Sequence, residues 1–320
     1  MLILSENDLR SVLNYKNVLK ALESGFVAYM RKGKFPLRTA IDSDENKTTV
    51  LFMPSSFLDK SGVKIVSLCE NNPSNRLPYT RGIYVLVSLK DGAPLCVMNG
   101  TYLTYIRTAV TSLLASKYLA KKDPKTLGII GTGKIGLMTC EAHLSHFEIE
   151  KVYAFDKLEY SLNSFNQRLN VYNNLDDTVL CKNGNEVVSS SDIVITATTS
   201  TTPIFNSRSV KEGTHINAIG AYKKTMQEIP EGLVLRSKIF VDTLEGATSE
   251  PGDIVIPLQN GLINKEDIRE ISDVILKRIS RSNLDITLFK SVGFSLEDII
   301  TAELAYSESK KNGIGTEVEL

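Results

Sequence analysis

The chain has 320 residues, a length that suggests about two domains. Its 37 Lys and Arg residues balance its 37 Asp and Glu residues, so no global field would recruit nucleic acid or an anionic membrane. No apolar run approaches the roughly 20 residues needed to span a bilayer, and the N-terminus does not resemble a signal peptide. The four cysteines and three histidines show no metal-ligand spacing. We therefore expect a cytoplasmic protein without metal, nucleic-acid or membrane partners.

The N-terminal third mixes helix and strand. Residues 5–8, Ser-Glu-Asn-Asp, match a capping box, and residues 16–32 repeat apolar side chains at helical spacing. Residues 104–120 predict a longer helix, and residues 121–125, which include a proline, are the expected hinge. Between these helices, alternating or apolar runs predict strands at 47–54, 62–69, 82–89 and 93–100, the last two joined by a hairpin turn at 90–92.

In the middle of the chain, short apolar runs alternate with helical patterns. Strands that are apolar throughout are typical of parallel strands buried on both faces. The sequence therefore predicts an α/β fold, in which a Rossmann-type doubly wound parallel sheet spans residues 121–295. Residues 1–120, joined by a C-terminal helix within 296–320, form a second, α+β domain. The parallel strands are expected at 127–131, 151–156, 178–182, 192–197, 214–219 and 238–242.

The stretch "LGIIGTGKIG" at residues 127–136 places a glycine motif between a strand and a helix, as a dinucleotide site requires. Its glycines permit a tight turn, close approach of the backbone to a pyrophosphate, and packing of helix on strand, while the helix N-terminus attracts phosphate. The alternative is a structural turn without a ligand. The candidate contacts are Gly131, Thr132, Gly133, Lys134, Ile135 and Gly136.

Asp156 ends the second parallel strand, twenty residues after Gly136. A carboxylate there accepts hydrogen bonds from the ribose hydroxyls and repels a 2′-phosphate, which favours NAD. The neighbouring Lys157 could attract that phosphate, so NADP stays open. Thr198 and Thr199 follow the fourth strand and are further candidate cofactor contacts, or else polar residues that cap the strand end.

Three cations in the N-terminal third lie where a cation is unexpected. Lys64 shares strand parity with Val66 and Leu68, which places it on an apolar face. Arg107 falls in the first turn of the expected helix, where the macrodipole disfavours a cation, and Arg38 lies at a junction between loop and strand. Each would be stabilised by an anion, either a substrate carboxylate or a carboxylate of the protein. In the first case a partly desolvated Lys64 would also transfer protons.

Several stretches together resemble the ornithine cyclodeaminase/μ-crystallin family over nearly the whole chain. The most specific are "NGTYLTYIRTAVTSLLASKYLA" (99–120), the glycine motif that follows it, and "ITLFKSVGFSLEDI" (286–299). "GTHINAIGAY" (213–222) and "VDTLEGATSEPGD" (241–253) extend the match. The resemblance implies a homodimer whose subunits combine a Rossmann domain with a domain that binds substrate and dimerises.

Members of this family act on α-amino or α-imino acids with a nicotinamide cofactor. They include ornithine and lysine cyclodeaminases, archaeal-type alanine dehydrogenase, and reductases of cyclic ketimines such as pyrroline-2-carboxylate. The resemblance implies that Arg38, Lys64 and Arg107 bind the substrate carboxylate and that Lys64 also carries the proton. The positions implied near the nicotinamide are Thr108, Ser291, Val292 and Gly293.

Tyr222 occupies the position at which the cyclodeaminases carry an aspartate that handles the substrate's amino groups. A phenol, whose pKa is about 10, stays neutral at pH 7 and is a poor partner for an ammonium group. The residues therefore favour an NAD(P)-dependent oxidoreductase, like alanine dehydrogenase or a ketimine reductase, that interconverts a small α-amino acid and its α-imino or keto acid. The alternatives are an ornithine cyclodeaminase with recycled NAD and a non-catalytic μ-crystallin-like binding protein.

Overall fold

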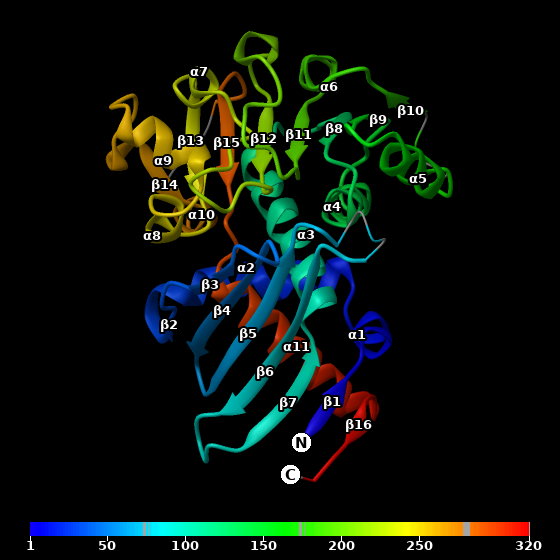
Figure 1. Ribbon diagram of the computed structural model, residues 1–320, viewed down its shortest axis with the longest axis vertical. Helices are drawn as coiled ribbons and strands as arrows, with labels where there is room; N and C mark the ends of the chain where they lie inside the picture. The colour runs from blue at the N-terminus through cyan, green and yellow to red at the C-terminus, as the bar shows by residue number, and fades with distance from the viewer. Residues whose placement is uncertain (73–74, 76, 173–174, 176, 278–281, 320) are drawn as a thin grey trace. The chain divides into compact units, whose positions relative to one another are not determined.

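The computed structural model describes residues 1–72, 75, 77–172, 175, 177–277 and 282–319 (Figure 1). The chain divides into two compact units, one formed by Met1–Arg107 with Phe294–Leu320 and the other by Thr108–Gly293. This division falls inside helix α3 (Gly100–Leu119), while the expected hinge at residues 121–125 leads from α3 into strand β8 (Thr126–Ile130) of the second unit. We call them the first unit and the second unit.

The first unit is built around a mostly antiparallel sheet. Its strands run in the order β16-β1-β7-β6-β5-β4-β2, and β3 also pairs with β4. Apart from α3, its helices are α1 (Glu6–Val12), α2 (Tyr15–Lys32) and α11 (Ser295–Asn312). The strands are β1 (Leu2–Leu4), β2 (Gly33–Lys34), β3 (Thr39–Ser43), β4 (Thr48–Phe57), β5 (Lys60–Cys69), β6 (Thr80–Ser88), β7 (Pro94–Asn99) and β16 (Thr316–Glu317).

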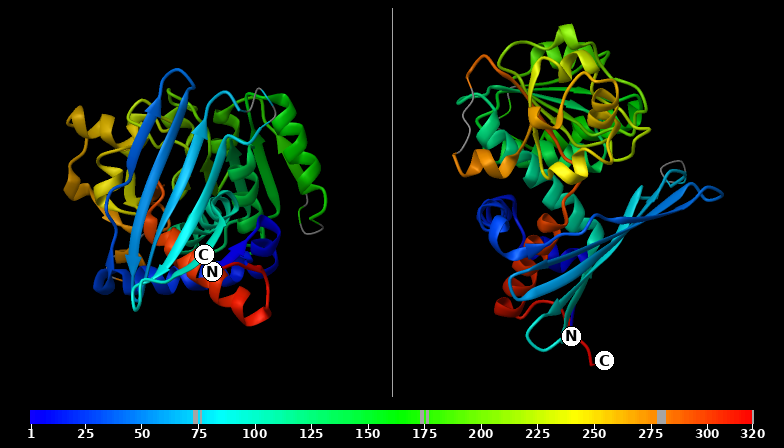
Figure 2. Two further views of the ribbon diagram at one scale, coloured as in Figure 1. Left: turned by 60° about the horizontal axis from the view of Figure 1, so that its bottom comes forward. Right: turned by 90° about the vertical axis from the view of Figure 1, so that its left-hand side faces the viewer.

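Within the part of the chain that the structure describes, helices cover one face of this sheet and leave the other uncovered. Helix α11 packs on β4, β5 and β6, and α2 packs against α11 (Figure 2). Among the described residues, the strands therefore alternate between side chains buried under α11 and side chains on an outer face. The capping box at residues 5–8 is confirmed, because Asp8 N–H donates to Ser5 Oγ and Ser5 N–H donates to Asp8 Oδ2.

The second unit contains a parallel sheet of eight strands in the order β10-β9-β8-β11-β12-β15-β13-β14. Its helices are α4 (Lys134–Leu144), α5 (Glu159–Leu169), α6 (Gly184–Ser190), α7 (Glu231–Val234), α8 (Leu244–Ala247), α9 (Gly252–Gln259) and α10 (Ile271–Ile275), with single 3₁₀ turns at Ser207–Ser209 and Lys265–Asp267. The strands besides β8 are β9 (Lys151–Phe155), β10 (Asp177–Leu180), β11 (Ile193–Thr196), β12 (His215–Ala218), β13 (Ser237–Val241), β14 (Ile268–Glu270) and β15 (Ile286–Lys290).

Two apolar cores cover the two faces of the parallel sheet. Ile193 and Ile195 of β11 pack with Phe165 of α5, whereas Val194 of the same strand packs with Val187 of α6 and Leu233 of α7. Successive strand residues point to opposite faces, so a strand that is buried on both sides must be apolar throughout. This explains the continuous apolar runs in the sequence and confirms the predicted doubly wound fold.

Several short strands were not predicted from the sequence. β1, β2, β3 and β16 span two to five residues each, which is too short for a strand periodicity to be seen. β14 and β15 also went unrecognised, and β15 lies between β12 and β13 although it follows both in the chain. Within the described residues, no helix is both long enough and apolar enough to cross a membrane.

Candidate functional site

Lys64 lies in the middle of β5 and its side chain is fully buried. It pairs with Met53 of β4 on one side and with Tyr84 of β6 on the other, and Tyr84 pairs with Met98 of β7. All four residues point to the face that α11 covers, as the alternation along β5 predicts. Lys64 is thus the charged member of a row whose other side chains, on the neighbouring strands, are large and uncharged.

The anions that hold this lysine come from the first turn of α11. Lys64 Nζ donates to Asp298 Oδ1 at 2.8 Å, and Arg107 Nε donates to the same oxygen at 2.9 Å. Arg107 Nη1 donates to Glu297 Oε2 at 2.8 Å. Two buried cations therefore face two buried carboxylates, an arrangement that is stable only because every charge has an opposite partner. We call Lys64, Arg107, Glu297 and Asp298 the charged cluster.

The environment of Lys64 makes its ammonium easier to deprotonate than that of an exposed lysine. Burial, followed by the nearby Arg107 guanidinium, lowers the pKa of Lys64 to about 8, against the opposing effect of Asp298. An exposed lysine has a pKa of about 10.4. Burial also raises the pKa of the neighbouring Tyr84 phenol, which therefore stays neutral and hydrogen-bonds to Ser55 Oγ at 3.3 Å. Lys64 is thus the group in this row whose charge changes near physiological pH.

The expectation that Arg107 lies in the first turn of its helix is wrong. α3 begins at Gly100, and Asn99 Oδ1 accepts a hydrogen bond from Tyr102 N–H at the helix start. Arg107 is therefore in the helix interior, where the macrodipole is weak. Its need for an anion comes instead from burial, and protein carboxylates supply that anion, which was the alternative left open by the sequence.

Arg38 immediately precedes β3 and is partly buried. Thr39, the next residue, pairs with Phe52 of β4, so the Arg38 backbone lies at the end of the row that runs through Met53 to Lys64. Two strand spacings separate Arg38 from Lys64 in that row, or about 10 Å. The structure thus brings Lys64 and Arg107 into direct contact with Asp298 and places Arg38 farther along the same row.

In the second unit, the glycine motif forms the turn between β8 and α4. Gly131 has a φ of 96°, which favours glycine, and a Cβ on Gly136 would collide with the Gly131 carbonyl oxygen. Gly133 is the N-cap of α4 and offers no side-chain cap, and a Cβ there would meet open space. The first N–H groups of α4 therefore lie at an accessible, uncapped helix N-terminus, which suits a phosphate.

Asp156 follows β9 and holds this turn. Its Oδ2 accepts hydrogen bonds from Thr132 N at 2.7 Å and from Thr132 Oγ1 at 3.0 Å, while its Oδ1 accepts from Leu158 N at 2.9 Å. Each carboxylate oxygen can accept more than one bond, so these contacts are compatible with ribose hydroxyls as further partners. Lys134 and Lys157 are exposed at the same end of the sheet.

The other predicted cofactor contacts lie after β11, after β15 and in α3, and the predicted substrate contact Tyr222 follows β12. Thr198 follows β11 and is bound through both its N–H and its Oγ1 to the buried Glu228, while Thr199 is exposed. Tyr222 follows β12 and is partly buried. Thr108 is buried in α3. Carboxyl ends of parallel strands are where ligands of open α/β sheets bind.

The turn after β15 is held by a carboxylate that was not predicted. Asp242 Oδ2 accepts from Ser291 Oγ at 2.8 Å and from the N–H groups of Val292 and Gly293, each at 3.0 Å. Burial raises the pKa of Asp242, and these donors oppose that change. Because the turn's N–H groups are bound to the protein, a cofactor contact here would use the other atoms of the turn.

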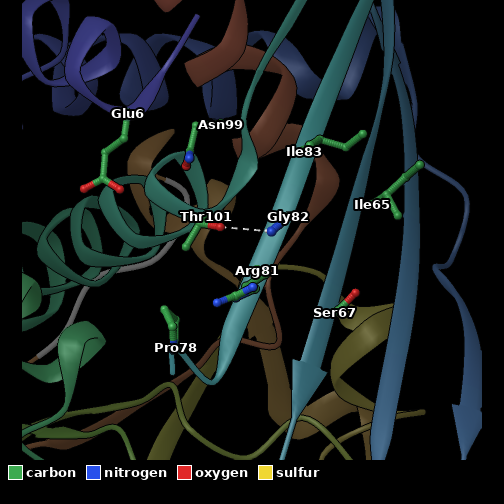
Figure 3. Close-up of a pocket in the computed structure, with 9 residues that line it drawn as sticks. All are labelled: Glu6, Ile65, Ser67, Pro78, Arg81, Gly82, Ile83, Asn99 and Thr101. Atoms are coloured by element: carbon green, nitrogen blue, oxygen red, sulfur yellow. Dashed lines mark hydrogen bonds between the residues drawn. The ribbon is translucent and has the colours of Figure 1, made fainter. Parts of the chain in front are cut away.

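A separate open pocket lies on the outer face of the sheet in the first unit (Figure 3). Its volume is about 520 Å³, and Arg81, Ile83, Ile65 and Thr101 are among its lining residues. Ile65 points to the face opposite Lys64, because the two are neighbours along β5. The pocket therefore contains none of the predicted site residues.

The structure adds buried charged residues that sequence reasoning missed. The only sequence signal for Glu297 and Asp298 was a pair of acids at the start of an otherwise apolar helix face, in "SLEDII". Asp242 is the last residue of the strand predicted at 238–242, a place where ligand contacts often lie, and it was not predicted as a site residue. The remaining missed residues are Glu228, Asp253 and Lys290, which are all fully buried.

Comparison with known proteins places these features in a family. A model of the ornithine cyclodeaminase/mu-crystallin family matches residues 1–313. A Delta(1)-pyrroline-2-carboxylate reductase of Bacillus cereus is 33% identical over 326 aligned residues, with both chains covered completely. A solved Delta(1)-pyrroline-2-carboxylate reductase of Thermococcus litoralis, in complex with NADH and L-proline, has a TM-score of 0.96 at 36% identity and covers 99% of this chain and 100% of its own.

An archaeal alanine dehydrogenase dimer with bound NAD has a TM-score of 0.93 at 30% identity, with 100% of this chain and 99% of that chain covered. The match thus extends over the charged cluster as well as the glycine motif. These similarities confirm the family resemblance and the Rossmann-type fold inferred from the sequence. The chain belongs to the ornithine cyclodeaminase/mu-crystallin family.

Proposed function

We propose that this protein is an NAD(P)-dependent oxidoreductase that reduces a cyclic α-imino acid, of the pyrroline-2-carboxylate type, to the corresponding amino acid. The observation that carries the proposal is Lys64, a fully buried lysine whose pKa is lowered to about 8 next to the Arg107 guanidinium. The relatives named above support the substrate class, since two of them are pyrroline-2-carboxylate reductases.

The cofactor is assigned to the second unit. The uncapped N-terminus of α4 and the open space beside Gly133 fit a pyrophosphate, and Asp156 fits the ribose hydroxyls. NAD is the proposed cofactor, with NADP kept open by the exposed Lys157. Two solved relatives hold NADH or NAD, which supports this choice. When bound, the nicotinamide supplies the hydride.

The reaction adds a hydride to the imine carbon and a proton to the imine nitrogen, so the C=N double bond becomes a C–N single bond. We assign the proton to Lys64, which loses it and becomes a neutral amine until solvent restores the charge. A pKa near 8 leaves most of Lys64 protonated at pH 7 while keeping it acidic enough to donate. Asp298, at 2.8 Å, orients the ammonium.

The substrate carboxylate is assigned to Arg38 and Arg107. Arg107 Nε donates to Asp298 and Arg107 Nη1 donates to Glu297. These carboxylates hold the guanidinium in one orientation, which reduces the entropy lost when an anion binds. Tyr222, a neutral phenol in place of the cyclodeaminase aspartate, fits an imine better than the second ammonium group of ornithine.

We also infer that the first unit dimerises through the outer face of its sheet. That face is mostly apolar, although no helix covers it among the described residues, and Ile83 at its centre is 46% exposed. Apolar patches of this kind mark interfaces in soluble proteins. The apolar residues of the face include Val50, Phe52, Val63, Ile65, Ile83, Val85, Val87, Leu95 and Val97.

Light scattering at micromolar concentration tests the assembly. We expect a mass twice the 35.4 kDa of the chain. Ile83→Glu would place a charge in the interface and shift the mass toward the monomer. Leu235→Glu, at a 54% exposed position of the second unit, is the matched control and should remain dimeric. A monomeric wild-type chain would contradict the inference.

The function is tested by following absorbance at 340 nm with NADH and with NADPH. We expect oxidation of the reduced cofactor with pyrroline-2-carboxylate as substrate. Oxidation only with pyruvate plus ammonia would instead identify an alanine dehydrogenase. Release of ammonia from ornithine without net NADH would identify a cyclodeaminase, and a non-catalytic binding protein would do none of these.

A further inference from the structure

Glu228 is a fully buried carboxylate that binds the two loops after β11 and β12 at once. Its Oε1 accepts from Thr198 N at 2.7 Å and from Thr198 Oγ1 at 2.8 Å. Its Oε2 accepts from Gly220 N at 2.9 Å and from Ala221 N at 3.1 Å. Four donors thus converge on one side chain, and they come from neighbouring strand ends at the edge where ligands of parallel sheets bind.

The two loops are also packed tightly on each other and on the glycine motif. A Cβ on Gly220 would collide with the Thr198 backbone, so glycine is required where the loops touch. A Cβ on Gly131 would lie 2.9 Å from Thr198 Cγ2 and 2.6 Å from the Ala197 carbonyl oxygen. Thr198 is therefore in direct contact with both the first glycine of the phosphate turn and the loop that leads to Tyr222.

The backbone at Glu228 is held by a second buried carboxylate, that of Asp253. Asp253 Oδ1 accepts from the N–H groups of Glu228 at 2.7 Å and Ile229 at 2.9 Å. Lys290, the last residue of β15, places its Nζ 3.0 Å from Asp253 Oδ2. All three charged side chains are fully buried, so the ends of β11, β12 and β15 are joined through one ionic arrangement.

The four donors around the side chain of residue 228 determine which chemical groups can stand there. Three of the four donors are backbone N–H groups, which cannot accept, so both oxygens must be hydrogen-bond acceptors. A glutamine would turn an NH₂ group toward N–H donors and leave buried groups unpaired. All four of these donors belong to the loops after β11 and β12, so Glu228 would act on a ligand through the position of those loops.

We propose that Glu228 is a positioning residue that sets Thr198 for the dinucleotide and, through Gly220 and Ala221, sets Tyr222 for the substrate. The inference rests on the proposed function, because it assigns these loops to cofactor and substrate. It assigns to one buried side chain a joint influence on affinity for both ligands. A residue with a merely structural role would alter stability but not the affinities of the folded protein.

The test is Glu228→Gln in the full chain, with Glu212→Gln at an exposed position as the control. NADH affinity is measured by calorimetry without substrate, and folding is followed by thermal denaturation. We expect NADH binding to weaken about tenfold or more, the scale of one charged hydrogen bond, and the KM for pyrroline-2-carboxylate to rise in parallel. Glu212→Gln should match the wild type in both.

Thr198→Val separates positioning from folding, because it removes one donor to Glu228 and keeps the backbone bond. We expect it to weaken NADH binding without lowering the melting temperature, and the double variant to bind no worse than Glu228→Gln alone. Unchanged NADH affinity in folded Glu228→Gln, or in Thr198→Val if the glutamine variant does not fold, would overturn the inference. A wild type that binds no NADH would instead overturn the proposed function itself.

Discussion

In the first unit, the buried cations Lys64 and Arg107 are bound by carboxylates of α11, whereas in the second unit the buried carboxylates Glu228 and Asp242 are bound largely by backbone N–H groups. The first arrangement contains a lysine with a pKa of about 8, so its charge can change during a reaction. The second arrangement holds the loops after β11 and β12 and the turn after β15 in place. In the proposed function, the first unit therefore transfers the proton and the second unit positions the cofactor.

The largest effect is expected from removing the group that titrates. Lys64→Ala should leave NADH binding intact but lower turnover by about 10²-fold or more, the typical contribution of general acid catalysis. Steady-state kinetics at 340 nm, together with NADH calorimetry, measures both quantities. Lys60→Ala, on the same strand but paired with Asp59 near the surface, is the control and should keep normal turnover. Near-normal turnover in Lys64→Ala would make this lysine structural.

Arg107 tests whether the charged cluster also binds the substrate. Arg107→Lys keeps the charge but loses the planar fork, so we expect KM to rise about tenfold with a smaller change in kcat. Arg107→Ala should raise KM further, and it should also lower the melting temperature because Glu297 and Asp298 lose a buried partner. If KM is unchanged in the lysine variant, the substrate carboxylate binds elsewhere.

A smaller effect is expected in the second unit, where we propose that Asp156 determines the preference for NAD over NADP. Asp156→Asn keeps an acceptor for Thr132 N–H but removes the charge that repels a 2′-phosphate. Affinity for NADPH relative to NADH should rise about tenfold, equivalent to roughly 1.4 kcal/mol. Calorimetry with both cofactors measures the ratio, and Glu159→Gln on the neighbouring helix is the control. An unchanged ratio would remove Asp156 from the ribose site.

The same comparison explains what the sequence could predict. The glycine motif and six strands of the parallel sheet are local patterns within short stretches of chain, and the strands around Lys64 show a clear alternation, so the sequence predicts these features. The partners of Lys64 and Arg107 lie 234 and 191 residues away in the chain, and no local pattern links them. The contacts of Glu228 and the place of β15 in the sheet likewise depend on loops and strands that are distant in the chain, so no local pattern predicts them.

The helix that carries Arg107 shows a different limit. Its start was placed four residues too late because Asn99-Gly100 resembles a strand end followed by a breaker, whereas Asn99 acts as the helix cap. Arg107 therefore lies in the helix interior, and the macrodipole does not explain its need for an anion. The need for an anion at Arg107 was nevertheless inferred, and its partner came from the protein. Its proposed role toward a substrate remains a prediction.

The most direct test of the account is the pH dependence of kcat/KM for imine reduction, in the wild type and in Asp298→Asn. The proposed mechanism requires protonated Lys64, so kcat/KM should be flat at low pH and fall as pH rises through about 8. Loss of the Asp298 charge, which favours the ammonium form, should move this limb to lower pH by about one unit. A wild-type profile without a limb near pH 8, or a limb that Asp298→Asn does not move, would contradict the assignment of Lys64 as the proton carrier.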